Sequence, residues 1–373
     1  MKNTLLITLE YPPQVGGVAN YLANICANLP REQIVVLAPR APQSYLFDHT
    51  QKYKICRRKL LAKNILFWPK WLFLFWHTCK IVKTEKIEKI LVGQVLPVGY
   101  TALILHKFFK IPYAVFTYGM DITEPMKNQW KKKMVISILK KADKIITIGD
   151  YTRNKIIGLG IASDKIIIVH PCSNIQNTKY KIQNNIKEKY NLADKKIILT
   201  VGRLVERKGQ DKVIEALPKI LEKIPDTVYL IVGEGQNLLN LQSKILNLKL
   251  ENNVILTGKV SDEELASYYE LCDIFIMPSR EINGDVEGFG IVYLEANSFG
   301  KPVIGGRSGG VSDAVIDGQT GLLVDPNNVE ETTATVIKLL TDDNLRNKLG
   351  EQGRERVERE FKWENEAEKV SRL

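Results

Sequence analysis

Cysteine is scarce in this chain, and no cysteine pattern indicates a disulfide framework or a zinc site. The five cysteines are an odd number, are scattered along 373 residues and never form a C-x-x-C pair. They are Cys26, Cys56, Cys79, Cys172 and Cys272. This distribution predicts reduced, buried thiols in a cytosolic protein, and it argues against a small secreted domain held together by disulfides.

Long hydrophobic runs are also missing. No segment offers the roughly 18 uninterrupted apolar residues of a membrane-spanning helix. The first residues, MKNTLLITLEYPP, hold too short an apolar run for a signal peptide and no small-residue cleavage site. We interpret them as a first buried strand and expect a cytoplasmic protein without a membrane span.

Clustered metal ligands are absent from the sequence as well. The four histidines lie far apart, at His49, His77, His106 and His170. No set of His, Cys and Asp residues has the spacing of a metal site, so we expect no metal and no cofactor. Helix-turn-helix, RNP and zinc signatures of nucleic-acid-binding proteins are missing too.

Positive charge is abundant and unevenly distributed. The net charge is +11, and residues 1–178 carry 26 Lys and Arg against 10 Asp and Glu. This surplus suggests an anionic partner for the first half, either a membrane surface or a nucleic acid. A well-solvated, lysine-rich surface is the alternative interpretation.

Residues 57–83 combine basic residues with Trp68, Trp71 and Trp76. One interpretation is a segment at a membrane surface, with its rings at the headgroup level and its lysines on anionic lipid. The other is a helix whose aromatic face packs on a sheet. With the charge surplus, the two interpretations remain open.

Short apolar runs alternate with amphipathic stretches along nearly the whole chain. This alternation predicts parallel sheets with helices on both faces, a doubly wound α/β fold that occurs twice. Helices are expected at 210–223, 262–271 and 329–340. Strands are expected at 5–9, 34–37, 90–92, 113–117, 144–148, 166–169, 197–201, 228–232, 254–257, 274–277, 302–304 and 321–324.

The polar, asparagine-rich stretch 173–190 predicts the domain boundary. We expect an N-terminal Rossmann-like domain over 1–178 and a C-terminal one over 179–358. A helix over 359–373 would return to the N-terminal domain. Since ligands of doubly wound sheets bind beyond the carboxyl ends of the strands, we expect the two domains to bind a ligand in a cleft between them.

Two cations follow the expected strand 197–201, in the stretch VGRLVERKGQD. Arg203 and Lys208 lie in a loop before an expected helix. Backbone N–H groups, the helix dipole and a bidentate arginine favour a pyrophosphate at such a junction. The alternative is a surface loop whose basic residues face water.

A glycine pair stands where the first strand has ended and an amphipathic helix begins. Gly16 and Gly17, in YPPQVGGV, would let the backbone approach a ligand closely and leave helix N–H groups free for phosphate. Such turns also serve tight packing alone.

Two glutamates, Glu287 and Glu295, surround a turn in DVEGFGIVYLEANSFG. Glu287 precedes an expected helix and Glu295 lies in its second turn. Carboxylates accept pairs of hydrogen bonds from vicinal diols, so this pair suits a ligand with a sugar at one end and a ribose at the other. The alternatives are a first-turn acid stabilised by the helix dipole and a solvated helix residue. Gly309 and Gly310, further on, indicate chain reversal together with close backbone approach to a ligand.

These motifs together resemble the retaining glycosyltransferases of family four, which have the GT-B fold. The resemblance rests on GRLVERKG, on the two glutamates around Gly-Phe-Gly, on GGVSDAVIDGQTGLLVDP and on YPPQVGGV. It is strongest over 197–326 and extends more weakly over nearly the whole chain. It implies two Rossmann-like domains facing each other across a cleft.

The resemblance also implies roles for individual residues. Arg203 and Lys208 match the pyrophosphate clamp, Glu287 the carboxylate on the sugar hydroxyls, and Glu295 the one on the ribose diol. The remaining donor-binding residues implied by the family are Gly16, Gly17, Lys259, Val260, Gly288, Phe289, Gly290 and Ile291. In FTYGMDI, Tyr118 replaces the family's histidine on the donor sugar, while Asp121 is retained.

The expected function is therefore transfer of a hexose from a nucleotide sugar to a glycan or lipid-linked acceptor, with retention of configuration and without a metal. The stretch PSREINGDVEGFG looks most like mannosyl-transferring members, which favours GDP-mannose, with UDP-sugars next. A GT-B phosphorylase or a sugar-nucleotide epimerase is the alternative enzyme. The alternative outside enzymes is a basic nucleic-acid-binding protein, which the acidic second half disfavours. Expected partners are the nucleotide sugar, the acceptor and an anionic membrane surface, with no nucleic acid.

Overall fold

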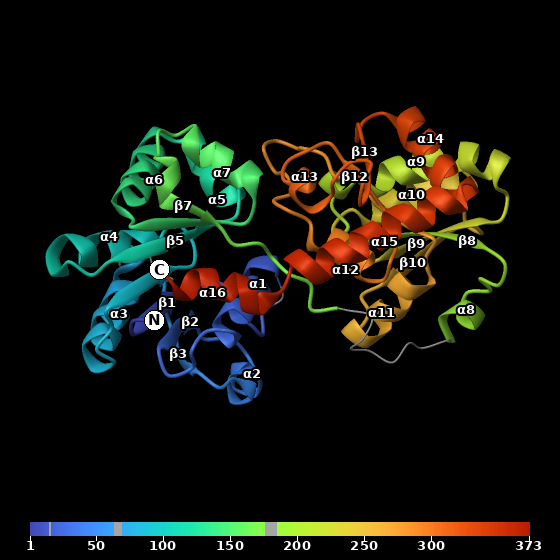
Figure 1. Ribbon diagram of the computed structural model, residues 1–373. Coiled ribbons are helices and arrows are strands. Elements are labelled where there is room, and N and C mark those ends of the chain that lie inside the picture. The colour runs from blue at the N-terminus through green and yellow to red at the C-terminus, as the bar shows by residue number, and fades with distance from the viewer. Residues whose placement is uncertain (15, 63–68, 176–184) are drawn as a thin grey trace. The chain divides into compact units, whose positions relative to one another are not determined.

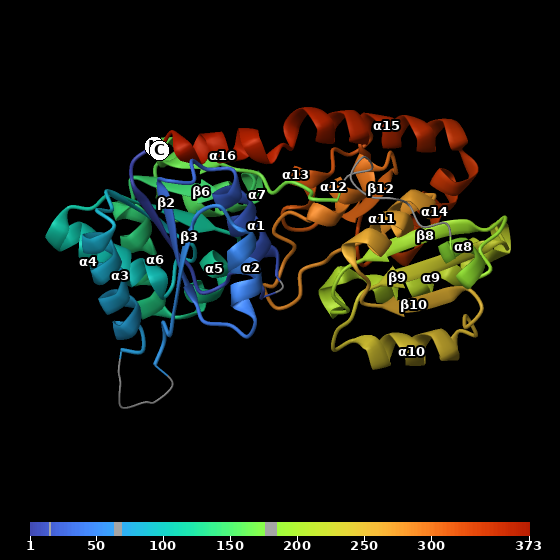
Figure 2. The same cartoon turned by 90° about the horizontal axis from the view of Figure 1, so that it is seen from below.

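The computed structural model describes residues 1–14, 16–62, 69–175 and 185–373. The chain divides into two compact units (Figures 1 and 2). Unit 1 comprises Met1–Pro171 together with Trp363–Leu373, and unit 2 comprises Cys172–Lys362. The boundary expected after residue 178 falls in 176–184, which lies outside the described residues, as do Val15 and Trp68.

Unit 1 contains a seven-stranded sheet in the order β3-β2-β1-β4-β5-β6-β7, and every neighbouring pair is parallel. Its strands are β1 (Thr4–Ile7), β2 (Ile34–Pro39), β3 (Lys54–Arg58), β4 (Lys89–Val92), β5 (Tyr113–Thr117), β6 (Lys144–Thr147) and β7 (Ile166–Ile168). The order reverses between β1 and β4, where Leu5 is aligned with Val35 on one side and Ile90 on the other. The central strands are apolar without alternation because helices cover both faces of the sheet.

The helices of unit 1 form a layer on each face of this sheet (Figure 2). They are α1 (Gly17–Ala27), α2 (Ser44–Thr50), α3 (Leu72–Thr84), α4 (Val98–Phe109), α5 (Met120–Thr123), α6 (Gln129–Lys141), α7 (Asp150–Ile157) and α16 (Trp363–Ser371). Buried side chains of α3, α4 and α6, such as Leu74, Ala102 and Ile138, pack against β1, β4 and β5.

The other face is covered by α1, on which α16 packs. The ring of Tyr21 lies 5.8 Å from that of Phe116 in β5 and 5.8 Å from that of Trp363. The Glu366 carboxylate of α16 accepts a 2.8 Å hydrogen bond from the backbone N–H of His170. The C-terminal helix is therefore a component of unit 1.

Unit 2 contains a six-stranded parallel sheet in the order β10-β9-β8-β11-β12-β13. Its strands are β8 (Lys196–Val201), β9 (Thr227–Val232), β10 (Val254–Gly258), β11 (Ile274–Met277), β12 (Val303–Gly306) and β13 (Gly321–Val324). Here the order reverses between β8 and β11. In doubly wound sheets this switch point is where ligands bind.

The helices of unit 2 are α8 (Asn185–Lys189), α9 (Gln210–Lys223), α10 (Leu238–Asn247), α11 (Asp262–Leu271), α12 (Ile291–Ser298), α13 (Val311–Ala314), α14 (Val329–Thr341) and α15 (Asp343–Glu360). The first turn of α11 shows how side chains determine where a helix begins. In α11, the Ser261 side chain accepts from the backbone N–H of Glu264, whose carboxylate accepts from that of Ser261. The α/β fold of two doubly wound sheets is confirmed.

Across the described residues, no helix combines the length and the apolarity needed to cross a bilayer.

Candidate active site

Three loops meet at the carboxyl ends of the central strands of unit 2. They follow β8, β11 and β12, and backbone contacts join them. The N–H of Arg280 donates to the carbonyl of Arg207 at 2.8 Å, and that of Gly310 donates to the carbonyl of Glu287 at 2.7 Å. A Cβ on Gly310 would lie 2.1 Å from the carbonyl oxygen of Gly288, so this position requires glycine. The glycines after β12 thus hold the Glu287 loop in place.

A cluster of opposite charges lies at this junction. The turn Glu206–Lys208 (η3) directs both Arg207 and Lys208 toward the loop after β11. Lys208 Nζ lies 2.5 Å from Glu287 Oε2, and Arg207 Nη1 lies 2.8 Å from the same oxygen. Arg207 Nε also lies 3.1 Å from Asp285 Oδ1. The side chains of Arg207, Lys208 and Glu287 are only 9, 10 and 12% exposed.

Burial and charge act in opposite directions on these groups. Burial by itself would raise the pKa of the Glu287 carboxyl, but the charges of Lys208 and Arg207 outweigh it and lower the pKa to about 2. Burial lowers the pKa of the Lys208 ammonium, and the Glu287 carboxylate opposes that decrease. Glu287 is therefore ionised at neutral pH, and its charge compensates two buried cations.

Arg203 lies in the loop that follows β8, as expected. It is exposed, whereas Arg207 makes the contact with Glu287. Arg203 and Arg207 both line a cavity of about 450 Å³, together with Gly235, Gln236 and Asp285. Arg207 and Asp285 of the charged cluster therefore contribute to the wall of this open cavity, and Arg203 lies at its exposed side.

Glu295 lies in the second turn of α12, as expected. Its Oε2 accepts a 2.6 Å hydrogen bond from the hydroxyl of Tyr269 in α11. Burial raises the pKa of the Glu295 carboxyl to about 7, although the Tyr269 hydrogen bond acts to lower it. Tyr269 was missed by sequence reasoning, because α11 and α12 are joined only through the tertiary fold.

The remaining expected donor-binding residues of unit 2 lie at the same edge of the sheet. Gly290, with φ of +93°, begins α12, and a Cβ there would lie 2.5 Å from the ring of Tyr293. Packing alone therefore requires this glycine. Phe289 is buried, and Gly288 and Ile291 are half-buried. Lys259 is exposed and Val260 half-buried, directly after β10.

Unit 1 has its own group of polar residues beyond the carboxyl ends of β1 and β5. The Asp121 Oδ1 atom accepts hydrogen bonds from the backbone N–H groups of Tyr118 at 2.8 Å and Gly119 at 3.0 Å. Gly16 lies beside Glu10, whose Oε2 would be 3.9 Å from a Cβ on that glycine. Around Gly17, a Cβ would meet nothing within 4 Å. Among the described residues outside their immediate neighbours, packing thus requires a glycine at neither position.

Two buried oxygens in this group, Tyr118 Oη and Asp121 Oδ2, have no hydrogen-bond partner among the described residues. Burial raises the pKa of the Asp121 carboxyl to about 6, and burial is also the main cause of the raised pKa of Glu10. Since buried polar atoms are almost always paired, a ligand or water is expected here. Glu10 was missed by sequence reasoning, and its place just after the first strand was the available signal.

Within the described part of the chain, no three His, Cys, Asp or Glu side chains form a group that could hold a metal ion.

Solved structures share this fold over nearly their full length. The chain superimposes on Anabaena HepE in complex with UDP with a TM-score of 0.84 and 18% identity, covering 100% of this chain and 99% of that one. A glycosyltransferase from Rickettsia africae gives a TM-score of 0.82 and 21% identity, with 99 and 97% coverage. The two doubly wound units define the GT-B class of glycosyltransferases.

Sequence comparison identifies the family within this class. Residues 15–176 match the model of "Glycosyltransferase Family 4", and residues 182–356 match that of "Glycosyl transferases group 1". An uncharacterised glycosyltransferase of Methanocaldococcus jannaschii is 31% identical over 96% of this chain and 94% of its own length. The chain belongs to glycosyltransferase family four, as the motifs predicted.

Another relative has a more specific name. The GDP-mannose-dependent α-(1-6)-phosphatidylinositol monomannoside mannosyltransferase of Mycolicibacterium smegmatis is 28% identical, over 99% of this chain and 97% of its own length.

Proposed function

We propose that this enzyme transfers mannose from GDP-mannose to a lipid-linked acceptor, with retention of anomeric configuration and without a metal ion. The observation that carries the proposal is the Arg207–Lys208–Glu287 cluster at the strand-order switch of unit 2. Similarity to a GDP-mannose-dependent enzyme whose acceptor is a phosphatidylinositol mannoside supports the choice of donor and acceptor.

In the proposed reaction, charge grows on the departing diphosphate while the bond from the anomeric carbon to its oxygen breaks. Lys208 and Arg203 supply positive charge there, as a metal ion does in other enzymes. The acceptor oxygen attacks from the same face, and its proton passes to the leaving phosphate oxygen. Glu287 orients the sugar hydroxyls and forms no covalent bond.

We assign donor binding to unit 2 and acceptor binding to unit 1. The unpaired oxygens of Tyr118 and Asp121 support a polar ligand in unit 1. For a lipid-linked acceptor, unit 1 would also have to lie at a membrane. The basic surplus in residues 1–178 supports peripheral binding to an anionic bilayer surface.

A thermal-shift screen of GDP-mannose, UDP-glucose and an ADP-sugar tests the donor. Because a ligand that binds only the folded state stabilises it by about 2.7 kcal/mol at a hundred times its Kd, GDP-mannose is expected to raise the melting temperature by a few degrees. The other two should raise it less. If no nucleotide sugar shifts the transition, the assignment of unit 2 as a donor site is wrong.

Donor affinity is expected to increase with pH through the titration of Glu295. Its folded-state pKa of about 7 lies above the ordinary value of 4.5. Between pH 4.5 and pH 7 the folded protein therefore retains a proton on Glu295 that the unfolded chain releases. The stability that this proton contributes is complete below pH 4.5 and is lost as the pH rises through 7. A ribose diol donates to the ionised carboxylate, so binding would release that proton.

From pH 6 to pH 8 we expect the Kd for GDP-mannose to fall by up to about tenfold. Titration calorimetry in buffers of different ionisation enthalpy measures both the affinity and the proton released. Glu295→Gln should bind more weakly and show a flat pH profile. Equal pH dependence in the two proteins would remove Glu295 from the nucleoside site.

A further inference from the structure

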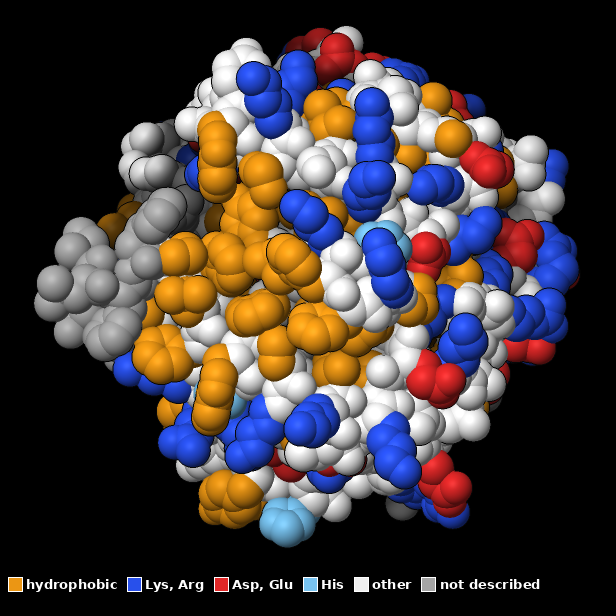
Figure 3. Space-filling model, turned by 90° about the vertical axis from the view of Figure 1, so that its left-hand side faces the viewer, with side chains coloured by type: hydrophobic (Ala, Val, Ile, Leu, Met, Phe, Trp, Pro, Cys, Tyr) orange, Lys and Arg blue, Asp and Glu red, His pale blue; other side chains and the backbone are white. Residues whose placement is uncertain are grey.

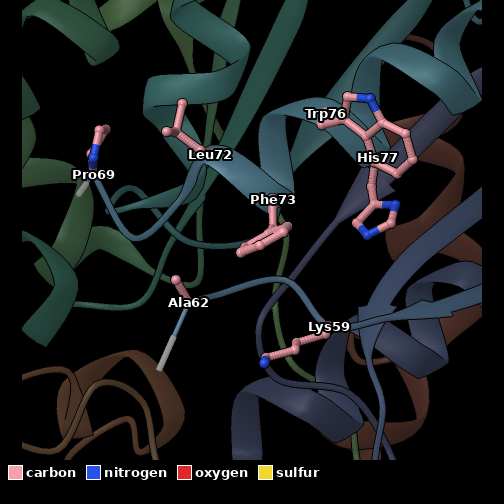
Figure 4. A pocket seen from close by; sticks show the side chains of 7 residues that line it. All are labelled: Lys59, Ala62, Pro69, Leu72, Phe73, Trp76 and His77. Atoms are coloured by element: carbon pink, nitrogen blue, oxygen red, sulfur yellow. The ribbon is translucent and has the colours of Figure 1, made fainter. Parts of the chain in front are cut away.

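An apolar cavity of about 550 Å³ opens in unit 1, and its described lining includes none of the polar residues discussed above. It lies between the first turns of α3 and the chain that follows β3 (Figure 4). Its lining residues are Lys59, Ala62, Pro69, Leu72, Phe73, Trp76 and His77. In Figure 4 the ring of Phe73 extends toward the segment that carries Ala62 and Lys59. The volume is in the range of cavities that bury a small ligand, roughly 300–1,000 Å³.

The mouth of this cavity is unusually apolar for a protein surface. Trp76 is 60% exposed, Leu72 46% and Phe73 37%. Figure 3 shows apolar side chains gathered in a broad patch on this face of the molecule, with lysines and arginines around it. Contiguous apolar patches of this kind mark sites where a protein meets an apolar partner.

Aromatic rings extend the patch over three helices. The ring of Trp71, next to the cavity, lies 5.6 Å from that of Tyr100 in α4. Tyr100 in turn lies 6.0 Å from Trp130 at the start of α6, which is 60% exposed. Tryptophan and tyrosine favour the headgroup level of a bilayer, where one edge of the ring is apolar and the other is wet.

The charge of this face selects the kind of apolar partner. The helices α3, α4 and α6, all within the described residues, contain eight lysines and no Asp or Glu. Arg40, Arg58 and Lys59 line an adjoining cavity of about 490 Å³, and Lys59 also borders the apolar one. After burial, the charges of Arg58, Lys80 and Arg40 are the main causes that lower the pKa of His77, so these cations lie close to the cavity. An anionic group at its mouth would be stabilised.

We propose that this cavity binds one hydrocarbon chain of an anionic membrane phospholipid, whose phosphate lies against Arg58 and Lys59. The inference rests on the membrane part of the proposed function and gives it a defined site. Each CH₂ group of the chain that leaves water adds to the affinity, in addition to the contacts of the phosphate. The protein would then hold a lipid molecule, in addition to lying on the bilayer surface.

Dodecyl phosphate, used below its critical micelle concentration, tests the site on the whole chain by titration calorimetry. We expect saturable binding at one site and none by inorganic phosphate at the same concentrations. Leu72→Ser should weaken the binding about tenfold, because it removes apolar lining at an exposed position. Leu239→Ser is the matched control, since Leu239 is 76% exposed on α10 of unit 2.

Ala62→Phe, which would fill the cavity, is a second variant and should abolish uptake. Absence of saturable uptake by the wild type overturns the inference. So do equal effects of Leu72→Ser and Leu239→Ser, or binding that inorganic phosphate reproduces.

Vesicles of phosphatidylglycerol and phosphatidylcholine separate this inference from the proposed function. Leu72→Ser should reduce co-flotation with them, while the thermal shift with GDP-mannose stays unchanged. If the wild type and Leu72→Ser co-float equally, the protein binds the bilayer surface without taking up a lipid chain, and the inference is overturned. Loss of the GDP-mannose shift in the wild type, with uptake retained, would overturn the donor assignment alone.

Discussion

Glu287→Gln is expected to lower kcat by about a thousandfold, the size of effect seen when one preorganised electrostatic group is lost from an active site. The substitution keeps the shape of the side chain and removes its charge. Arg207 and Lys208, both within 2.8 Å of Glu287 Oε2, would lose their counter-charge, and the sugar would lose its acceptor. Initial rates with GDP-mannose and an acceptor lipid measure the effect.

The same substitution is expected to destabilise unit 2. Removing one partner of a buried ion pair leaves uncompensated charge and costs about 3–5 kcal/mol. The depressed pKa of Glu287 has the same origin, so its contribution to stability is complete above pH 4.5 and disappears as pH falls toward 2. Urea denaturation at pH 7 therefore has to accompany the rate measurement.

Glu281→Gln is the matched control, because Glu281 is exposed in the same loop. It should change neither rate nor stability by a measurable amount. Folded Glu287→Gln protein with near-wild-type turnover would show that Glu287 has no part in the reaction.

Lys208→Met is expected to reduce kcat by about a hundred- to a thousandfold, because it removes positive charge from the leaving diphosphate. Its effect on stability should be smaller than that of Glu287→Gln. Methionine replaces the buried stem of the lysine, and Arg207 remains paired with Glu287 at 2.8 Å. Transfer assays and urea denaturation on one preparation give both quantities.

Lys212→Met provides the comparison for this variant. Lys212 lies in α9, four residues further on, and pairs with Glu215 at 2.8 Å on a half-exposed surface. Its loss should leave transfer intact. If Lys208→Met and Lys212→Met had equal turnover, Lys208 would have no role in charge stabilisation.

Much of the fold could be predicted from the sequence because most strands are buried on both faces. Apolar runs such as Tyr113–Thr117 and Ile274–Met277 mark their strands to the residue. The strand Lys54–Arg58 was missed, since KICRR lies at the sheet edge, where charged side chains reach solvent and no apolar run forms.

The sequence predicted several residues of the candidate site, but it did not predict which of their side chains form ion pairs with one another. Strand-end position marked Lys208 and Glu287, and the structure brings them together. Arg207 was missed, because the resemblance of GRLVERKG to the family's pyrophosphate clamp marked Arg203 and Lys208. The short turn Glu206–Lys208 instead directs Arg207 inward, and no periodicity reveals such a turn. The roles of these residues in transfer stay predictions.

The C-terminal helix has a consequence for synthesis of the protein. Unit 1 consists of Met1–Pro171 and Trp363–Leu373, so the ribosome completes all of unit 2 before it releases the last piece of unit 1. The α1 surface that Trp363 covers stays bare until residues 363–373 have been synthesised. Unit 2, encoded without interruption, can finish folding first. Nascent chains that stall before residue 363 therefore expose an unfinished first unit to chaperones and proteases.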